Sequence, residues 1–274
     1  MSNSDYAVTF ACYNQLKYTR MCVDSMLKHG FDLRKLVVVD NGSTDGTREY
    51  LQALPLGGCI FNRENMGCGV AWNQGSLALQ AEWTIIMNND ILVSAGWVDN
   101  LVAAAETEGL KVISPAMIEG DLDYDFDSFA VYASDKMRNV FRKGDVHAVC
   151  LAVHHSVWME VGYFRAEPKL FGYEDTLFFH ELQKAGIPRA ITGASWLHHF
   201  GSVTQAAMKE ERGFSQKEGL GNPYNYRLLN ISWKERKLRK WRQKRQQKKW
   251  RRMELENYRM SVYGVRNNGQ FRWL

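Results

Sequence analysis

The chain has 274 residues, enough for one large domain or for one domain with an appendage, and its 45% hydrophobic and 24% charged residues are ordinary for a globular protein. The net charge of +5 is unevenly distributed, because residues 233–252 hold twelve lysines and arginines and one glutamate. The rest of the chain therefore carries a net charge of −6, and the basic character belongs to one segment.

Cysteine usage and the first residues exclude several classes of protein. The five cysteines are odd in number and form no C-x-x-C pair, which argues against a disulfide framework or a zinc site and for a reducing compartment. The opening sequence, MSNSDYAVTFACYN, lacks the basic segment and apolar core of a signal peptide. No run of about 18 apolar residues occurs, so we expect no membrane-spanning helix and a cytoplasmic location.

Strand and helix patterns alternate from the start of the chain to about residue 90. The apolar run Leu36–Val39 shows no alternation, which is typical of a parallel strand covered on both faces. The predicted elements are strand Ala7–Cys12, a helix around Leu16–Leu27, strand Leu36–Val39, helix Thr47–Leu54, strand Cys59–Phe61, helix Val70–Leu79 and strand Trp83–Met87. Such alternation predicts an α/β fold with a mainly parallel sheet flanked by helices.

The strand Trp83–Met87 stops abruptly at Asn88, Asn89 and Asp90. In open α/β sheets, ligands bind at the carboxyl ends of the strands. A carboxylate at this position suits a hard cation that has oxygen ligands and bridges a diphosphate. The alternative is a strand end followed by an ordinary turn.

The second half of the chain continues with mixed patterns. Its predicted elements are helix Trp97–Glu108, strand Val112–Pro115, an acidic loop Glu119–Asp127, strand Val146–Val153, helix His155–Val161, an irregular segment Phe164–Gly172, helix Thr176–Ala185 and strand Ala190–Trp196. Glu174 and Asp175 open the helix at Thr176, and His198 and His199 follow the last strand.

Six motifs occur in order between Val8 and Thr204, namely VTFACYN, VVVDNGSTDGT, NMGCGVAWNQG, NND, FGYEDTLF and HHFGSVT. Their combination resembles family 2 glycosyltransferases of the GT-A fold, and a rhamnosyltransferase-like subgroup is the narrower resemblance. The resemblance implies a Rossmann-like, mixed and mainly parallel sheet in a catalytic domain at residues 1–205, followed by a basic helical extension at residues 206–274. It also implies a metal-dependent enzyme that moves a hexosyl or deoxyhexosyl group from a nucleotide-diphosphate sugar to a hydroxyl acceptor.

The resemblance also assigns residues to the donor. The positions that match the family's nucleotide and donor contacts are Thr9, Ala11, Tyr13, Asp40, Asn65, Gly67, Asn73, Asn88 and Asn89. Asp40 follows a strand, so its carboxylate can accept hydrogen bonds from a base or a ribose. The alternatives are an N-cap or Asx turn at Asp40, and a glycine-marked turn with helix packing around Gly67.

The metal motif departs from the family's usual Asp-x-Asp, because the triplet contains only one acid. The resemblance implies Asp90 as the ligand, with His199 as a second ligand and His198 as the alternative. One carboxylate, the diphosphate and water can still complete an octahedral Mg²⁺ or Mn²⁺ site.

The acids that open the helix at Thr176 match the family's catalytic base. Asp175 would take the proton of the acceptor hydroxyl, and Glu174 would orient the acceptor. A base on the face opposite the leaving group implies inversion at the anomeric carbon. The alternative is that both acids only favour the helix N-terminus through its dipole. The preceding Phe171–Tyr173 offers an aromatic wall for a sugar.

The basic segment, residues 233–252, reads WKERKLRKWRQKRQQKKWRR and favours a helix. Its interleaved tryptophans fit an anionic membrane surface that carries a lipid-linked acceptor, and also fit nucleic acid or packing on the chain's own domain. We expect a role in surface polysaccharide or glycolipid synthesis, with peripheral attachment at the inner face of the membrane. The alternatives are a non-catalytic nucleotide-sugar-binding protein and a nucleic-acid-directed glycosyltransferase.

Overall fold

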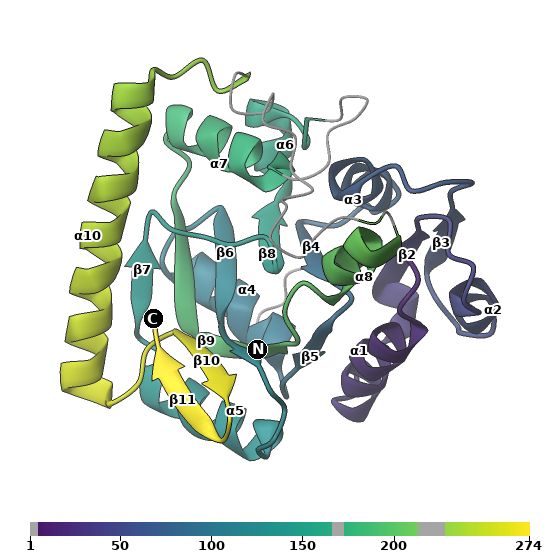
Figure 1. Ribbon diagram of the computed structural model, residues 1–274, viewed down its shortest axis with the longest axis horizontal. Coiled ribbons are helices and arrows are strands. Elements are labelled where there is room, and N and C mark those ends of the chain that lie inside the picture. The colour runs from purple at the N-terminus through teal and green to yellow at the C-terminus, as the bar shows by residue number, and fades with distance from the viewer. Residues whose placement is uncertain (1–4, 166–172, 212, 214–227) are drawn as a thin grey trace.

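The computed structural model describes residues 5–165, 173–211, 213 and 228–274 (Figure 1). The elements of its first part alternate as the sequence predicts. They are β1 (Tyr6–Cys12), α1 (Leu16–Lys28), the 3₁₀ turn η1 (Leu33–Lys35), β2 (Leu36–Asp40), α2 (Thr47–Gln52), β3 (Gly58–Phe61), α3 (Cys68–Leu77) and β4 (Trp83–Asn88).

In the second part, strands and helices alternate less regularly. Its elements are β5 (Ile91–Val93), α4 (Trp97–Thr107), β6 (Val112–Gly120), α5 (Phe126–Met137), β7 (Phe141–Lys143), β8 (Cys150–His154), α6 (His155–Val161), α7 (Glu174–Lys184), β9 (Arg189–His199), α8 (Val203–Glu211), α10 (Trp233–Tyr258), β10 (Tyr263–Asn267) and β11 (Gln270–Trp273).

The strands of the described residues form one mixed sheet. Its main path runs β11-β10-β6-β8-β4-β1-β2-β3, and β9 joins it through β6 while also pairing with β5 and β7. The segment β4-β1-β2-β3 is parallel throughout, and β6 pairs in parallel with both β9 and β10. The predicted α/β class, a mixed sheet flanked by helices, is therefore confirmed.

Both faces of the sheet are covered, which explains the unbroken apolar runs. Along β4, Ile85 and Met87 pack into the core beneath α1 and α4, whereas Ile86 packs into the core beneath α3, α6 and α7. Helix α3 lies very close to β1, because a methyl group at Gly75 would come 1.9 Å from the hydroxyl oxygen of Thr9. The parallel strands therefore end together at one edge, between helices on both sides.

For the acidic segment and the last predicted strand of the second half, the predictions were wrong in detail. The acidic segment predicted as a loop contributes Glu119 to β6, and its Asp125 caps α5 by accepting a hydrogen bond from the Ser128 amide. The last strand continues beyond Trp196 to His199, because it pairs with β5 at that end. The segment Phe164–Gly172, predicted to be irregular, lies outside the described residues from residue 166 onward.

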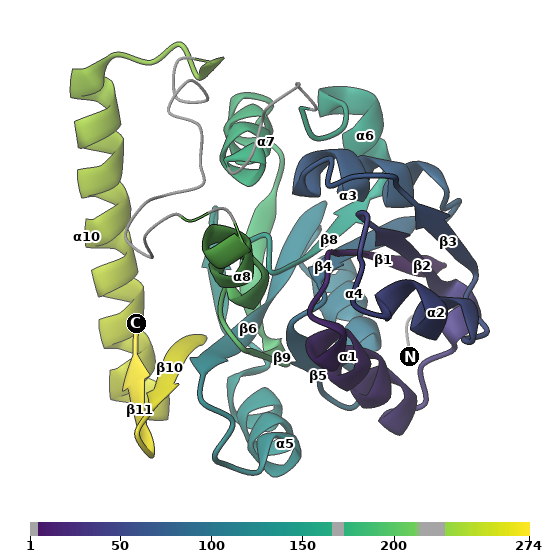
Figure 2. The ribbon, with the colours of Figure 1, turned by 45° about the vertical axis from the view of Figure 1, so that its right-hand side comes forward.

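The segment after residue 205 was expected to be helical, and this is wrong for its last part. Strand β10 pairs in parallel with β6 and antiparallel with β11, so this hairpin extends the central sheet. Helix α10 runs along one side of the molecule (Figure 2). It is held by a buried pair in which the Arg142 guanidinium donates to both oxygens of Glu254 at 2.8 and 2.9 Å. No helix in the described part of the chain combines the length and apolarity needed to cross a membrane.

Candidate active site

A cavity of about 1250 Å³ opens at the carboxyl ends of β1, β2 and β4. Its lining comes from many separate segments and includes Ala11, Tyr13, Asn41, Asn65, Gly67, Asn88, Asn89, Asp90, Glu174, Asp175 and His199. Asp90 and Asp175 are thus brought to one cavity from positions far apart in the chain. This is the edge at which a parallel α/β sheet offers room for a ligand.

Asp90 lies between β4 and β5, and β5 pairs antiparallel with the end of β9 so that Ile91 is opposite His199. The carboxylate Oδ1 of Asp90 is consequently 3.4 Å from Nε2 of His199, and both side chains are buried. Successive side chains of a strand point to opposite faces. His198 accordingly turns away from the cavity, and its Nδ1 lies 3.0 Å from the Tyr124 hydroxyl.

The ring of His199 lies between two carboxylates. Its other nitrogen, Nδ1, is 3.4 Å from Oε2 of Glu119. Burial alone lowers the pKa of His199, but Asp90 and Glu119 outweigh it and raise the pKa to about 9. The same contact with His199 holds the pKa of Glu119 below its usual value.

The pair Asp90 and His199 fits a divalent cation. Both ring nitrogens of His199 are buried and make no hydrogen bond within the described residues, and Nε2 would become a ligand when a cation displaces its proton. Carboxylate and imidazole groups are suitable donors for Mn²⁺, and the carboxylate also suits Mg²⁺. No group of three or more His, Cys, Asp or Glu in the described residues could hold an ion. Substrate oxygens and water would therefore have to complete the coordination.

Asp175 lies in the first turn of α7 and lines the same cavity. Its Oδ1 accepts a 2.7 Å hydrogen bond from the Thr176 amide, which fixes the orientation of the carboxylate. Burial raises the pKa of Asp175 above the usual value of an aspartate. Glu174 is buried beside α3, where a methyl group at Gly69 would come 2.9 Å from its Cγ.

The loop before α3 forms a compact amide network at the cavity wall. Asn41 donates from Nδ2 to Oδ1 of Asn65 at 3.1 Å and to the carbonyl of Gly67 at 3.3 Å. Gly67 has a φ of +87°, a conformation that favours glycine, and it is the N-cap residue directly before α3. Asn65 and Gly67, both predicted, therefore reach the cavity together, and Asn41 joins them.

Three predicted donor residues do not line the cavity. Asp40 is fully buried, and its Oδ2 lies 3.7 Å from Nε of Arg48. Its Oδ1 accepts a hydrogen bond from the Ser43 amide at 3.1 Å, which agrees with the alternative that Asp40 stabilises the turn after β2. Thr9 is buried against α3. Asn73 donates to the carbonyl of Phe164 and accepts from its amide, so it ties α3 to the segment after α6.

A sequence model described as glycosyl transferase family 2 matches residues 8–166, more than half of the chain. The chain belongs to this family. Glycosyltransferase GlyG of Streptococcus pneumoniae is 26% identical over 111 residues, which are 39% of this chain and 37% of GlyG. An uncharacterized glycosyltransferase of Rickettsia typhi is 33% identical over 88 residues, which are 31% of this chain and 27% of that protein. The matches thus span well under half of these relatives.

Solved structures of glycosyltransferases share the GT-A fold of this chain, at 14–18% sequence identity. GalNAc-T7, solved with UDP, GalNAc and Mn²⁺, has a TM-score of 0.61 at 14% identity, covering 86% of this chain and 50% of that one. Mannosyltransferase PcManGT of Pyrobaculum calidifontis, solved with GDP-Man and Mn²⁺, has a TM-score of 0.55 at 18% identity, and the match covers 84% of this chain and 69% of that one. TarS of S. aureus, solved with UDP-GlcNAc, has a TM-score of 0.54 at 16% identity, and the match covers 71% of this chain and 58% of that one.

Four residues at or beside the cavity were not predicted from the sequence. Asn41 follows Asp40 at a strand end, which was a signal available in the sequence. Cys68 and His147 line the cavity, and burial lowers the pKa of His147 to about 4. Glu119 was assigned to a loop, and only the pairing of β6 with β9 brings it to His199.

Proposed function

We propose that this chain is an inverting, metal-assisted glycosyltransferase that moves a hexosyl or deoxyhexosyl group from a nucleotide-diphosphate sugar to a hydroxyl acceptor. Residues 1–205 would form the catalytic domain and residues 206–274 a basic extension. The observation that carries the proposal is one cavity lined both by the pair Asp90 and His199 and by Asp175. These groups supply the two functions that glycosyl transfer needs, which are leaving-group stabilisation and proton removal.

The proposed reaction forms a bond from the acceptor oxygen to the anomeric carbon and breaks the bond from that carbon to the diphosphate. Asp175 accepts the hydroxyl proton, and the nucleoside diphosphate leaves with the bonding electrons. A bound Mg²⁺ or Mn²⁺ held by Asp90 and His199 would neutralise charge on the leaving diphosphate. Attack from the Asp175 side, opposite the diphosphate, inverts the anomeric configuration.

The donor would lie along the amide-rich wall of the cavity. Its proposed contacts are Ala11, Tyr13, Asn65, Gly67, Asn88 and Asn89, while Thr9, Asp40 and Asn73 would support this wall from beneath. Related folds bind UDP-GlcNAc and GDP-Man, so uridine and guanosine diphosphate sugars are the first donors to test. A deoxyhexose such as rhamnose would place the chain in the rhamnosyltransferase-like subgroup.

The basic residues of helix α10 favour an acceptor that carries phosphate and is linked to a lipid. The cavity extends to its inward side, where Arg239, Lys240 and Arg242 contribute to the lining. Trp233 and Trp241 are more than half exposed, and the ammonium of Lys237 lies 3.9 Å from the ring centre of Trp233. Aromatic and cationic side chains in this combination suit an anionic membrane surface. We therefore propose attachment at the inner membrane face and a role in surface polysaccharide or glycolipid synthesis.

A donor screen followed by product analysis tests the proposal. Thermal shift with a panel of nucleotide sugars and Mn²⁺ should identify one stabilising donor, and NMR of the product should show the inverted anomeric configuration. Retention would contradict the role given to Asp175. Donor binding without turnover on any acceptor, including vesicle-bound lipid diphosphates, would instead indicate a non-catalytic nucleotide-sugar-binding protein.

A further inference from the structure

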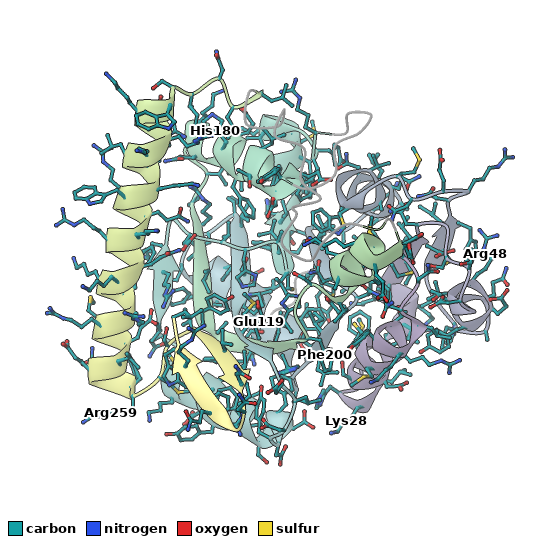
Figure 3. All side chains as sticks on the ribbon, viewed as in Figure 1. Lys28, Arg48, Glu119, His180, Phe200 and Arg259 are labelled. Carbon is teal, nitrogen blue, oxygen red and sulfur yellow. The ribbon has the colours of Figure 1, made fainter. Side chains whose placement is uncertain are left out.

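A series of side-chain contacts connects the β10–β11 hairpin to the proposed metal site. The hydroxyl of Tyr263 donates to Oε2 of Glu119 at 3.1 Å. The same oxygen lies 3.4 Å from Nδ1 of His199, whose Nε2 lies 3.4 Å from Oδ1 of Asp90. Figure 3 labels Glu119 near the ends of β9 and β10. Tyr263 lies outside residues 8–166, which match the family model.

The sheet register explains why these groups meet. Glu119 on β6 is paired directly with His199 on β9 in a parallel ladder, so the two side chains lie side by side on one face. On its other side β6 pairs with β10, where Tyr263 is opposite Met117. Gly264 allows this close approach, because a methyl group there would come 2.7 Å from Ile118.

The two ring nitrogens of His199 have different partners. A cation held by Asp90 and Nε2 would leave His199 with one ring proton, on Nδ1, and a carboxylate at Nδ1 accepts and holds that proton. Glu119 faces Nδ1, so Nε2 is left to face Asp90 and the cavity. His199 is only 5% exposed, so water cannot easily replace Glu119 in this role.

We propose that Glu119 and Tyr263 are positioning residues for the metal-binding histidine. Glu119 holds His199 with its proton on Nδ1 and its Nε2 directed to the ion, and Tyr263 fixes the rotamer of Glu119. The inference rests on the proposed function of Asp90 and His199 as ligands. It gives the β10–β11 hairpin a part in donor binding, although the hairpin contributes no residue to the cavity lining.

Mn²⁺ affinity, measured by electron paramagnetic resonance at saturating UDP or GDP, tests the proposal. Glu119→Ala should weaken Mn²⁺ binding about 10- to 100-fold, and Tyr263→Phe should weaken it about 10-fold or less, because outer-shell partners of metal ligands contribute on this scale. Tyr124→Phe is the matched control, since it removes a tyrosine hydroxyl from His198 on the same strand but not from the proposed site. It should leave Mn²⁺ affinity unchanged.

Nucleotide affinity in EDTA separates a positioning role from a structural one. It should be unchanged in Glu119→Ala, Glu119→Gln and Tyr263→Phe, whereas general damage to the fold would reduce it. Wild-type Mn²⁺ affinity in all three variants, with loss in Asp90→Asn, would overturn this inference and leave the proposed metal site standing. Unchanged Mn²⁺ affinity in Asp90→Asn, or no Mn²⁺ binding by the wild type with either nucleotide, would overturn both.

Discussion

Asp175→Asn removes the proposed proton acceptor and keeps the size and shape of the side chain. The asparagine Oδ1 can still accept the 2.7 Å hydrogen bond from the Thr176 amide, so the start of α7 and the overall stability should be preserved. Loss of a general base costs about 10²- to 10⁴-fold in rate, which is about 3 to 5 kcal/mol in the activation barrier. Donor affinity should not change, because the proposed contact of Asp175 is with the acceptor.

The pH dependence of the wild type provides a second measure of the same role. Asp175 must be ionised to accept a proton, and burial raises its pKa. The value of kcat/KM should therefore fall as pH decreases through this raised pKa, at a higher pH than for an aspartate with the ordinary value near 3.9. The residual activity of Asp175→Asn should lack this acidic limb.

Radiolabelled sugar transfer, measured with donor affinity by calorimetry, is the appropriate assay. Asp135→Asn is the matched control, because Asp135 is an aspartate with a side chain 83% exposed on α5. It should leave the rate and the pH profile as in the wild type. A turnover of Asp175→Asn within a few-fold of the wild type, or loss of donor binding together with transfer, would refute the assignment.

Three further predictions concern the scaffold and the extension. Arg142→Ala leaves the Glu254 carboxylate buried without its partner, so the free energy of unfolding in urea should fall by about 3–5 kcal/mol, and a loss below about 1 kcal/mol would contradict this. Gly75→Ala places a methyl group 1.9 Å from the Thr9 hydroxyl oxygen on β1 and should lower the free energy of unfolding, measured by thermal unfolding, by about 1–3 kcal/mol. Gly58→Ala, whose nearest contact is at 3.4 Å, should lower it less. Equal effects of the two substitutions would argue against the close approach of α3 to β1. Trp241→Ala should weaken binding to anionic vesicles in a flotation assay without slowing transfer to a water-soluble acceptor, and wild-type flotation would exclude this tryptophan from membrane attachment.

The first half of the fold was predictable because its signals are local. The run Leu36–Val39 is apolar at every position, and all of β2 is buried. The polar triplet after Met87 ends β4 and lines the cavity, as a strand-end position predicts. In the second half, the short helix His155–Val161 was also predicted with its observed bounds. Such features depend on hydrophobicity and turn chemistry within a few residues, which the sequence states directly.

The rest depended on pairing between distant segments. Glu119 reaches the site only because β6 pairs with β9, and the acidic composition around it favoured a loop. Asp40 and Thr9 were expected at the donor, but the packing of α3 and of the turn after β2 keeps both side chains out of the cavity lining. Helix α5 was not predicted because Asp125, its cap, looked like one more loop acid. Register and close packing of this kind have no signature within a short window of sequence.

The central claim is that donor and acceptor chemistry meet in one cavity, and a crystal structure with Mn²⁺ and a non-hydrolysable donor analogue tests it most directly. The anomalous signal of manganese should lie within about 2.3 Å of a carboxylate oxygen of Asp90 and of Nε2 of His199, and should contact the diphosphate. The Asp175 carboxylate should face the anomeric carbon from the side opposite the diphosphate. Manganese bound elsewhere, or Asp175 on the same side as the leaving group, would contradict the account.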